Sequence, residues 1–285
     1  MPSTSHFIEV HGSKMHYTEE GAGNPILFLH GMPTSSFLWR NIIPVVSSLG
    51  RCIAVDLIGM GKSDKPDIDY SFSDHVRYIE KFIEALNLKN LIIVMHGWGS
   101  VIGFDYAMRH ENNCRGLVFY ESYLQPLIGK DISLPLQEQI LSINHKNDDT
   151  DIATVVNTMM KQGVMESISE DIMNHYTAPF SQKNAEKVLH QYAKELSQKT
   201  QLNNFISSYS KKLMHSKLPK LMLYSVPGFI TPMSTVIWAK ENLSHIEIID
   251  IGEELHFAQE SNPTLMGEAM SVWLQSIEQL KKGDK

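Results

Sequence analysis

Residues 91–100 read Leu-Ile-Ile-Val-Met-His-Gly-Trp-Gly-Ser, and this stretch decides the fold. Apolar, strand-forming residues at 91–95 run directly into a turn of small residues, and an apolar helical pattern follows from Val101 to Met108. A strand that passes through so tight a turn into a helix holds the turn residue in a strained backbone conformation and can present a nucleophile. Here that residue is Gly97, which has no side chain.

Short, mostly apolar runs recur before and after this stretch, as expected of strands that are buried on both faces of a parallel sheet. The runs alternate with helical patterns, which predicts an α/β fold with a mostly parallel central sheet flanked by helices. A hairpin with its turn at His11-Gly12-Ser13 is expected to come first. The apolar runs cover residues 25–29, 51–56, 116–120, 218–224 and 246–251.

Residues 123–216 lose the strand pattern and read as helices separated by polar turns. A helical block of this size between two strands predicts an inserted cap domain, with residues 1–122 and 217–285 forming the core domain. The helices expected in the cap cover residues 134–143, 152–165, 170–175 and 185–209, the last as one long helix. An amphipathic helix is expected at residues 266–280.

The composition is that of a soluble globular protein: 285 residues, 42% hydrophobic and 20% charged, with a net charge of −7. The acidic balance argues against nucleic-acid binding, since no dense stripe of Lys and Arg opposes it. Neither a secretory signal nor an apolar run of membrane-spanning length is visible. We therefore expect a cytoplasmic protein with no membrane partner, as a monomer or a weak homo-oligomer.

Metal and cofactor sites are not expected. The 13 histidines are scattered, and neither a His-Glu-x-x-His pattern nor paired cysteines are present. The segment Gly59-Met60-Gly61-Lys62-Ser63-Asp64 resembles a phosphate-binding loop only superficially, because it lacks the required spacing and opens no helix.

Motifs along nearly the whole chain point to one family. Residues 30–41 are similar to His-Gly-Asn-Pro-Thr-Ser-Ser-Tyr-Leu-Trp-Arg-Asn, and residues 96–100 to His-Asp-Trp-Gly-Ser, of the haloalkane dehalogenases. These enzymes, with the related coelenterazine luciferases, belong to the α/β-hydrolase superfamily. Further segments that resemble this family, in the same order, are residues 56–66, 176–180, 218–221, 227–228 and 255–260.

The resemblance implies five parts for dehalogenation. An aspartate displaces halide to form an ester, a histidine activates water, a carboxylate orients the histidine, and two N–H donors hold the halide. It implies that His256 is the histidine, that Glu121 is the orienting carboxylate and that Trp98 is one donor. The plainer alternatives are a core tryptophan, a structural histidine and a solvated carboxylate at a strand end.

Two of the five parts are missing. Gly97 stands where the resemblance requires the nucleophilic aspartate, and it cannot form the ester. Met32 stands where the second donor, an asparagine, is expected, so that only its backbone N–H remains as a donor. Ser100 is expected to point away from the pocket mouth, which makes it a poor substitute nucleophile.

Three interpretations therefore stay open. The chain is a dehalogenase by ancestry that is inactive or very weak as written, because loss of one essential group removes several orders of magnitude in rate. Alternatively, His256 and Glu121 act as a general base without a covalent intermediate, as in lyase or cofactor-free oxygenase chemistry. The third interpretation is a non-catalytic binding protein. In each case the expected partner is a small apolar molecule, halogenated or not.

Overall fold

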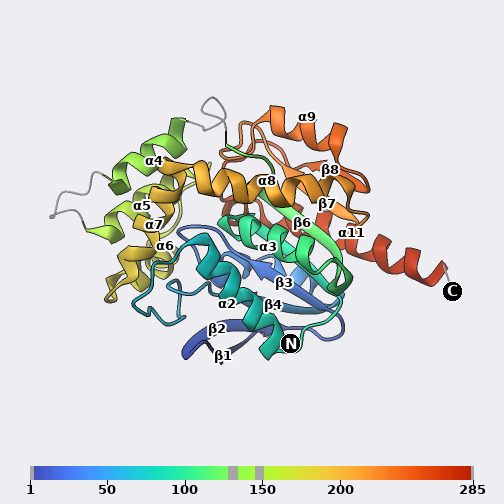
Figure 1. Ribbon diagram of the computed structural model, residues 1–285, viewed down its shortest axis with the longest axis horizontal. Helices are drawn as coiled ribbons and strands as arrows, with labels where there is room; N and C mark the ends of the chain where they lie inside the picture. Colours follow the sequence, from blue (N-terminus) through green and yellow to red (C-terminus); the bar gives the residue numbers. More distant parts are fainter. Residues whose placement is uncertain (1–2, 128–133, 145–150, 284–285) are drawn as a thin grey trace.

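The computed structural model describes residues 3–127, 134–144 and 151–283. Its centre is an eight-stranded sheet with the strand order β1-β2-β4-β3-β5-β6-β7-β8. Strands β1, β2 and β4 pair antiparallel, and every pairing from β4 to β8 is parallel. The strands are β1 Thr4–Val10, β2 Ser13–Glu20, β3 Pro25–Leu29, β4 Arg51–Val55, β5 Leu91–Gly97, β6 Cys114–Ser122, β7 Lys220–Tyr224 and β8 Ile246–Asp250. The predicted α/β fold, with a mostly parallel central sheet flanked by helices, is confirmed (Figure 1).

Helices fill the connections between the parallel strands, as crossovers in such a sheet require. The short helices are η1 Ser36–Trp39, α1 Ile43–Val46, η2 Glu111–Asn113, η3 Ala178–Ser181 and α10 Ala258–Ser261. The longer helices are α2 Phe72–Ala85, α3 Trp98–Arg109, α4 Leu134–Asn144, α5 Ile152–Gln162, α6 Glu170–Thr177, α7 Ala185–Gln198, α8 Thr200–His215, α9 Met233–Asn242 and α11 Pro263–Gly283. None of the described helices is long and apolar enough to cross a membrane.

Two glycines reveal how the helices cover the sheet. A Cβ at Gly103 of α3 would lie 2.4 Å from the sulfur of Met95 of β5, and one at Gly116 of β6 would lie 2.8 Å from the ring of Trp273 of α11. Gly116 pairs with Ile92, whose side chain points to the sheet face opposite that of Met95. Helices α3 and α11 therefore pack closely on opposite faces, and glycine is required where they approach the sheet.

The single long helix predicted over residues 185–209 is wrong. Lys199, with a φ of +44°, separates α7 from α8. Helix α7 packs against α4, whereas α8 packs against α3, so the two helices serve different neighbours. Polar residues at 197–200 carry no apolar stripe that would hold the chain straight.

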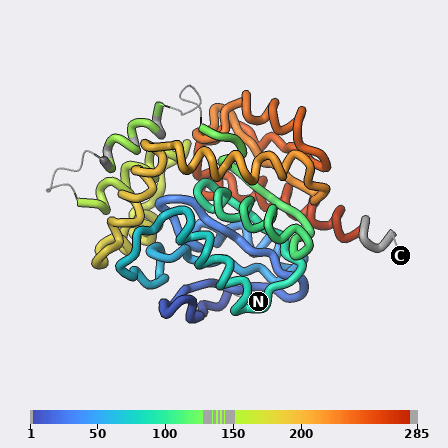
Figure 2. Tube along the Cα trace, viewed as in Figure 1, coloured from blue at the N-terminus to red at the C-terminus, as the bar shows by residue number. Residues whose placement is uncertain are grey.

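Helices α4 to α8 all lie between β6 and β7 in the chain. In Figures 1 and 2, α4 to α7 gather beside one end of the sheet, and α8 returns across α3 toward β7. The elbow between β5 and α3, at the carboxyl end of the central strands, faces this helical block. In open parallel sheets, the carboxyl ends of the strands are where ligands bind.

Candidate active site

Gly97 ends β5 and immediately precedes α3. Its φ of +49° and ψ of −123° lie outside the regions that residues with a Cβ ordinarily adopt. A Cβ built at Gly97 would lie 3.3 Å from Gly31 Cα and 3.3 Å from His256 Nε2. The elbow is thus present with its strained conformation, and the imidazole of His256 stands directly beside the point where a side chain would emerge.

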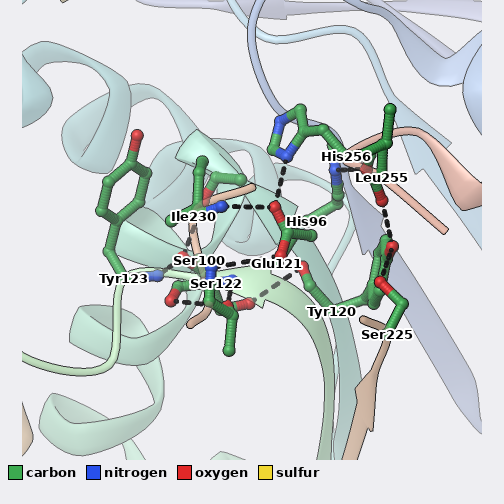
Figure 3. Close-up of polar contacts among 12 residues, drawn as sticks. His96, Ser100, Tyr120, Glu121, Ser122, Tyr123, Ser225, Ile230, Leu255 and His256 are labelled. Carbon is green, nitrogen blue, oxygen red and sulfur yellow. Dashed lines mark hydrogen bonds and ion pairs between the residues drawn. The ribbon is translucent and has the colours of Figure 1, made fainter. Parts of the chain in front are cut away.

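His256 and Glu121 form a buried pair (Figure 3). The Nδ1 atom of His256 lies 3.0 Å from Oε2 of Glu121. Because a carboxylate only accepts hydrogen bonds, Nδ1 carries the proton and Nε2 keeps its lone pair toward Gly97. The imidazole is therefore held in the tautomer of a general base.

The Glu121 carboxylate is itself fixed by backbone donors that sequence analysis missed. The amide of Ile230 donates to Oε2 at 2.6 Å, and the amide of Thr231 donates to Oε1 at 3.1 Å. Gly228 lies so close that a Cβ there would be 3.1 Å from Oε1. Only backbone geometry creates this cradle, so the side-chain pattern of residues 226–231 gave no signal of it.

His96 is a second residue that sequence analysis did not place in the site. Its Nε2 atom bonds the backbone oxygen of His256 at 2.9 Å, and the two rings are 4.3 Å apart. Burial, followed by the nearby His256, lowers the pKa of His96 well below 6.5, so this imidazole is neutral. It anchors the backbone that carries the base.

Trp98 follows the elbow and is buried, and its indole nitrogen has no hydrogen-bond partner among the described residues. The ring is packed edge to face against Tyr123, 6.2 Å away, and Tyr192 of α7, 5.1 Å away. An indole N–H can only donate. The site therefore keeps one buried donor that is available to an acceptor or an anion, with a residue of the inserted helices beside it.

Met32 is buried, and its chain neighbour Gly31 is the residue that touches the elbow. A thioether carries no hydrogen to donate, so this side chain adds apolar surface to the site. Ser100 is also occupied elsewhere, since its hydroxyl donates to the Gly97 oxygen at 2.7 Å and accepts from the Tyr123 amide at 2.9 Å. These two hydrogen bonds engage the Ser100 hydroxyl with the backbone around the elbow, so it is not free to act as a nucleophile.

The arrangement contains an oriented base and the free side-chain donor of Trp98, and the elbow residue supplies no attacking atom. It can take a proton from a substrate or a water, and it can hold a developing anion, but it has no group at position 97 to form an ester. Within residues 3–127, 134–144 and 151–283, no three or more His, Cys, Asp or Glu side chains gather as metal ligands would.

Comparison with known proteins places this geometry in context. Residues 24–281 match the family model of the alpha/beta hydrolase fold. Haloalkane dehalogenases from Mesorhizobium japonicum and Sphingobium indicum are each 33% identical to this chain, over 283 and 285 residues. Those alignments cover 95% of this chain, and 91% and 95% of the respective relatives.

Solved structures give the same result. The haloalkane dehalogenase DatA from Agrobacterium tumefaciens superposes with a TM-score of 0.90 at 28% identity, with 97% of each chain covered. The haloalkane dehalogenase DbeA from Bradyrhizobium elkani superposes with a TM-score of 0.91 at 30% identity, covering 98% of this chain and 99% of that one.

Proposed function

This chain belongs to the haloalkane dehalogenase family of α/β hydrolases, and from that premise we propose that it catalyses proton abstraction with the His256–Glu121 pair instead of covalent dehalogenation. The carrying observation is the 3.0 Å contact from His256 to Glu121 beside an elbow occupied by Gly97. The histidine–carboxylate contact of a general base is present, and position 97 has no side chain that could act as a nucleophile. We propose also that residues 123–216 act as a cap that excludes water from this site.

The unpartnered indole of Trp98 favours one class of reaction, in which an anion leaves. A small apolar cyanohydrin fits this description. His256 Nε2 takes the hydroxyl proton, the carbonyl forms as the carbon–carbon bond breaks, and cyanide departs with the bonding electrons toward the indole N–H. The imidazolium then returns its proton to cyanide, so the products are a ketone or aldehyde and hydrogen cyanide.

The proposal is tested by offering the chain a panel of aliphatic and aryl cyanohydrins and measuring release of the carbonyl product. We expect turnover that His256→Ala lowers on the order of 100-fold or more. Glu121→Gln should cost most of the same rate, because the amide no longer selects the productive imidazole tautomer. Trp98→Phe should lower the rate while the base remains intact.

The remaining outcomes distinguish the other interpretations. Oxygen consumption that depends on His256, without cyanide release, would replace the lyase assignment by cofactor-free oxygenase chemistry. Thermal stabilisation by small apolar ligands with no turnover of any substrate would contradict catalysis and indicate a binding protein. Release of halide from bromoalkanes by the chain as given would overturn the proposal outright.

A further inference from the structure

A second histidine–carboxylate pair lies outside the elbow site. In β2, His16 Nδ1 lies 2.8 Å from Asp56 Oδ2, and His16 Nε2 lies 2.8 Å from the hydroxyl of Ser5 in β1. Serine, imidazole and carboxylate thus follow one another in hydrogen-bond contact. This is the order and spacing by which a serine hydroxyl is activated for attack.

Asp56 is buried and ionised. Burial raises the pKa of its carboxyl, but the hydrogen bond and charge of His16, the charge of His30 and the Ser36 amide outweigh burial and lower it below 3.8. The amides of Ser36 and Lys62 each donate to this carboxylate at 2.7 Å. The loop at residues 59–64, which superficially resembles a phosphate loop, instead wraps this side chain, and a Cβ at Gly61 would lie 2.3 Å from Oδ2.

The tautomer of His16 follows from that carboxylate. Because ionised Asp56 can only accept, the neutral form of His16 donates through Nδ1 and presents the lone pair of Nε2. The hydroxyl of Ser5 must then be the donor in the contact with Nε2. In that form of the ring, the proton of the serine points at the atom that would remove it.

The serine is accessible, whereas the other two residues are buried. Ser5 pairs with Thr18 across the hairpin, and paired residues share one face of a sheet. Thr18 and His16 line a groove of about 860 Å³ that Asn174 and His175 of α6 also line. Figure 1 places β1 and β2 at the edge of the sheet, away from the elbow between β5 and α3.

We propose that Ser5 is the nucleophile of a second reactive site, with His16 as its general base and Asp56 as the positioning residue, and that this site takes small aryl esters. Phe7 supplies the aromatic surface, because its ring is 56% exposed and lies 5.1 Å from the His16 ring. Thr18 and Lys62 line the same groove and carry donors for a carbonyl oxygen that becomes negative.

The reaction is an acyl transfer. Ser5 Oγ bonds the carbonyl carbon while His16 Nε2 takes the hydroxyl proton, and the bond to the aryl oxygen then breaks as that proton passes to the leaving phenol. Water repeats the sequence on the acyl-serine and releases the acid, which restores the hydroxyl. Neither oxidant nor metal is consumed in these steps.

The opposite face of the same strand supplies a matched control. There Thr4 Oγ1 lies 2.7 Å from Nε2 of His6, and the ring of His6 stacks on Tyr17 at 5.2 Å. Hydroxyl and imidazole are in contact on both faces. Of these two histidines on the hairpin, His16 is the one whose far ring nitrogen is bonded to a buried carboxylate. Thr4→Ala removes a hydroxyl from β1 and leaves the proposed site untouched.

The experiment uses an alkyl fluorophosphonate, which a reactive serine attacks with loss of fluoride, followed by mapping of the labelled peptide. We expect Ser5 to be labelled on the order of 100-fold faster than Ser3, an exposed serine that precedes β1. His16→Asn should lower the maximal labelling rate by a similar factor without changing the half-saturating probe concentration. Asp56→Asn should do likewise, because a positioning residue affects the reaction step and not probe binding.

Turnover is then followed with p-nitrophenyl acetate. Hydrolysis should be lost in Ser5→Ala and kept in Thr4→Ala and in His256→Ala, which separates this site from the elbow. The proposal is overturned if Ser5 is labelled no faster than Ser3 in the parent chain, a comparison that needs no variant to fold. It is equally overturned if folded His16→Asn labels at the parent rate.

Discussion

One histidine–carboxylate pair lies at the elbow and another lies at the N-terminal hairpin, and each pair lacks a feature that the other has. At the elbow, His256 and Glu121 are enclosed beneath the carboxyl ends of the strands, but Gly97 offers no attacking atom. At the hairpin, His16 and Asp56 have an attacking atom in Ser5, but that serine is exposed. Exclusion of water and possession of a nucleophile are thus separable properties, and electrostatic catalysis is strongest where both coincide.

The largest expected effect comes from returning a nucleophile to the enclosed site. Gly97→Asp combined with Met32→Asn should release halide from bromo- and iodoalkanes roughly three orders of magnitude faster than the chain as given. The oriented base beside the elbow is then able to hydrolyse the ester. Ion chromatography of released halide measures this, with Gly97→Asn as the control of equal size that cannot form an ester. A silent double variant would show that the pocket no longer accepts haloalkanes.

Replacement of Asp56, the carboxylate that contacts His16 of the hairpin, should have the next largest effect. Asp56→Asn is expected to lower the free energy of unfolding by about 2–4 kcal/mol, because the buried His16 and two amide donors lose their charged acceptor. Urea denaturation of parent and variant gives the difference.

The same variant has a pH signature. Because the folded pKa of Asp56 is lowered from 3.8, its ionised form stabilises the fold above that pH, and this stabilisation is lost as the pH falls through the folded pKa. The gap between parent and Asp56→Asn should therefore be full at about pH 7 and should shrink at about pH 3. If the difference in unfolding free energy between parent and variant stayed constant with pH, the charge of the carboxylate would not contribute to stability.

A smaller effect is expected on the stability of the elbow. Gly97→Asp alone should cost about 1–3 kcal/mol, since a φ of +49° with a ψ of −123° is strained for any residue that has a Cβ. Gly97→Ala tests the same backbone cost without charge, and thermal denaturation compares both with the parent. An aspartate variant that melts above the parent would contradict the strain argument.

The smallest expected effect concerns the contribution of Ser5 to the stability of the fold. Ser5→Ala should change the free energy of unfolding by less than about 1 kcal/mol, because its hydroxyl is exposed and can be replaced by water. Denaturant titration of this variant and of Thr4→Ala should give similar values. A clearly larger loss of unfolding free energy in Ser5→Ala would mean that the contact of Ser5 with His16 is structural, and this would contradict the comparison.

Much of the elbow site was readable from the sequence. The apolar run at 91–95 and the small-residue turn are one-dimensional signals, as are the positions of Glu121 at the end of a strand and of His256 in a loop that follows one. The break at Lys199 was missed, because the polar residues at 197–200 include no glycine or proline that would mark the end of α7.

The hairpin site gave no sequence signal. Ser5 and His16 meet only because the turn at residues 11–12 sets the register of β1 against β2, and Asp56 arrives from a loop that follows β4. A one-residue slip in that pairing would send Ser5 to the other face. Register depends on packing and turn geometry, which no motif in this segment encodes.

By itself, the sequence determined that this chain folds as an α/β hydrolase of the dehalogenase family and that its elbow lacks a side chain, because local patterning and residue identity fix both. Only the tertiary structure decided which atoms meet: the amides of Ile230 and Thr231 on Glu121, and Ser5 on His16. Hydrogen bonds are specific to a few tenths of an ångström, and that precision exists only once distant segments have packed.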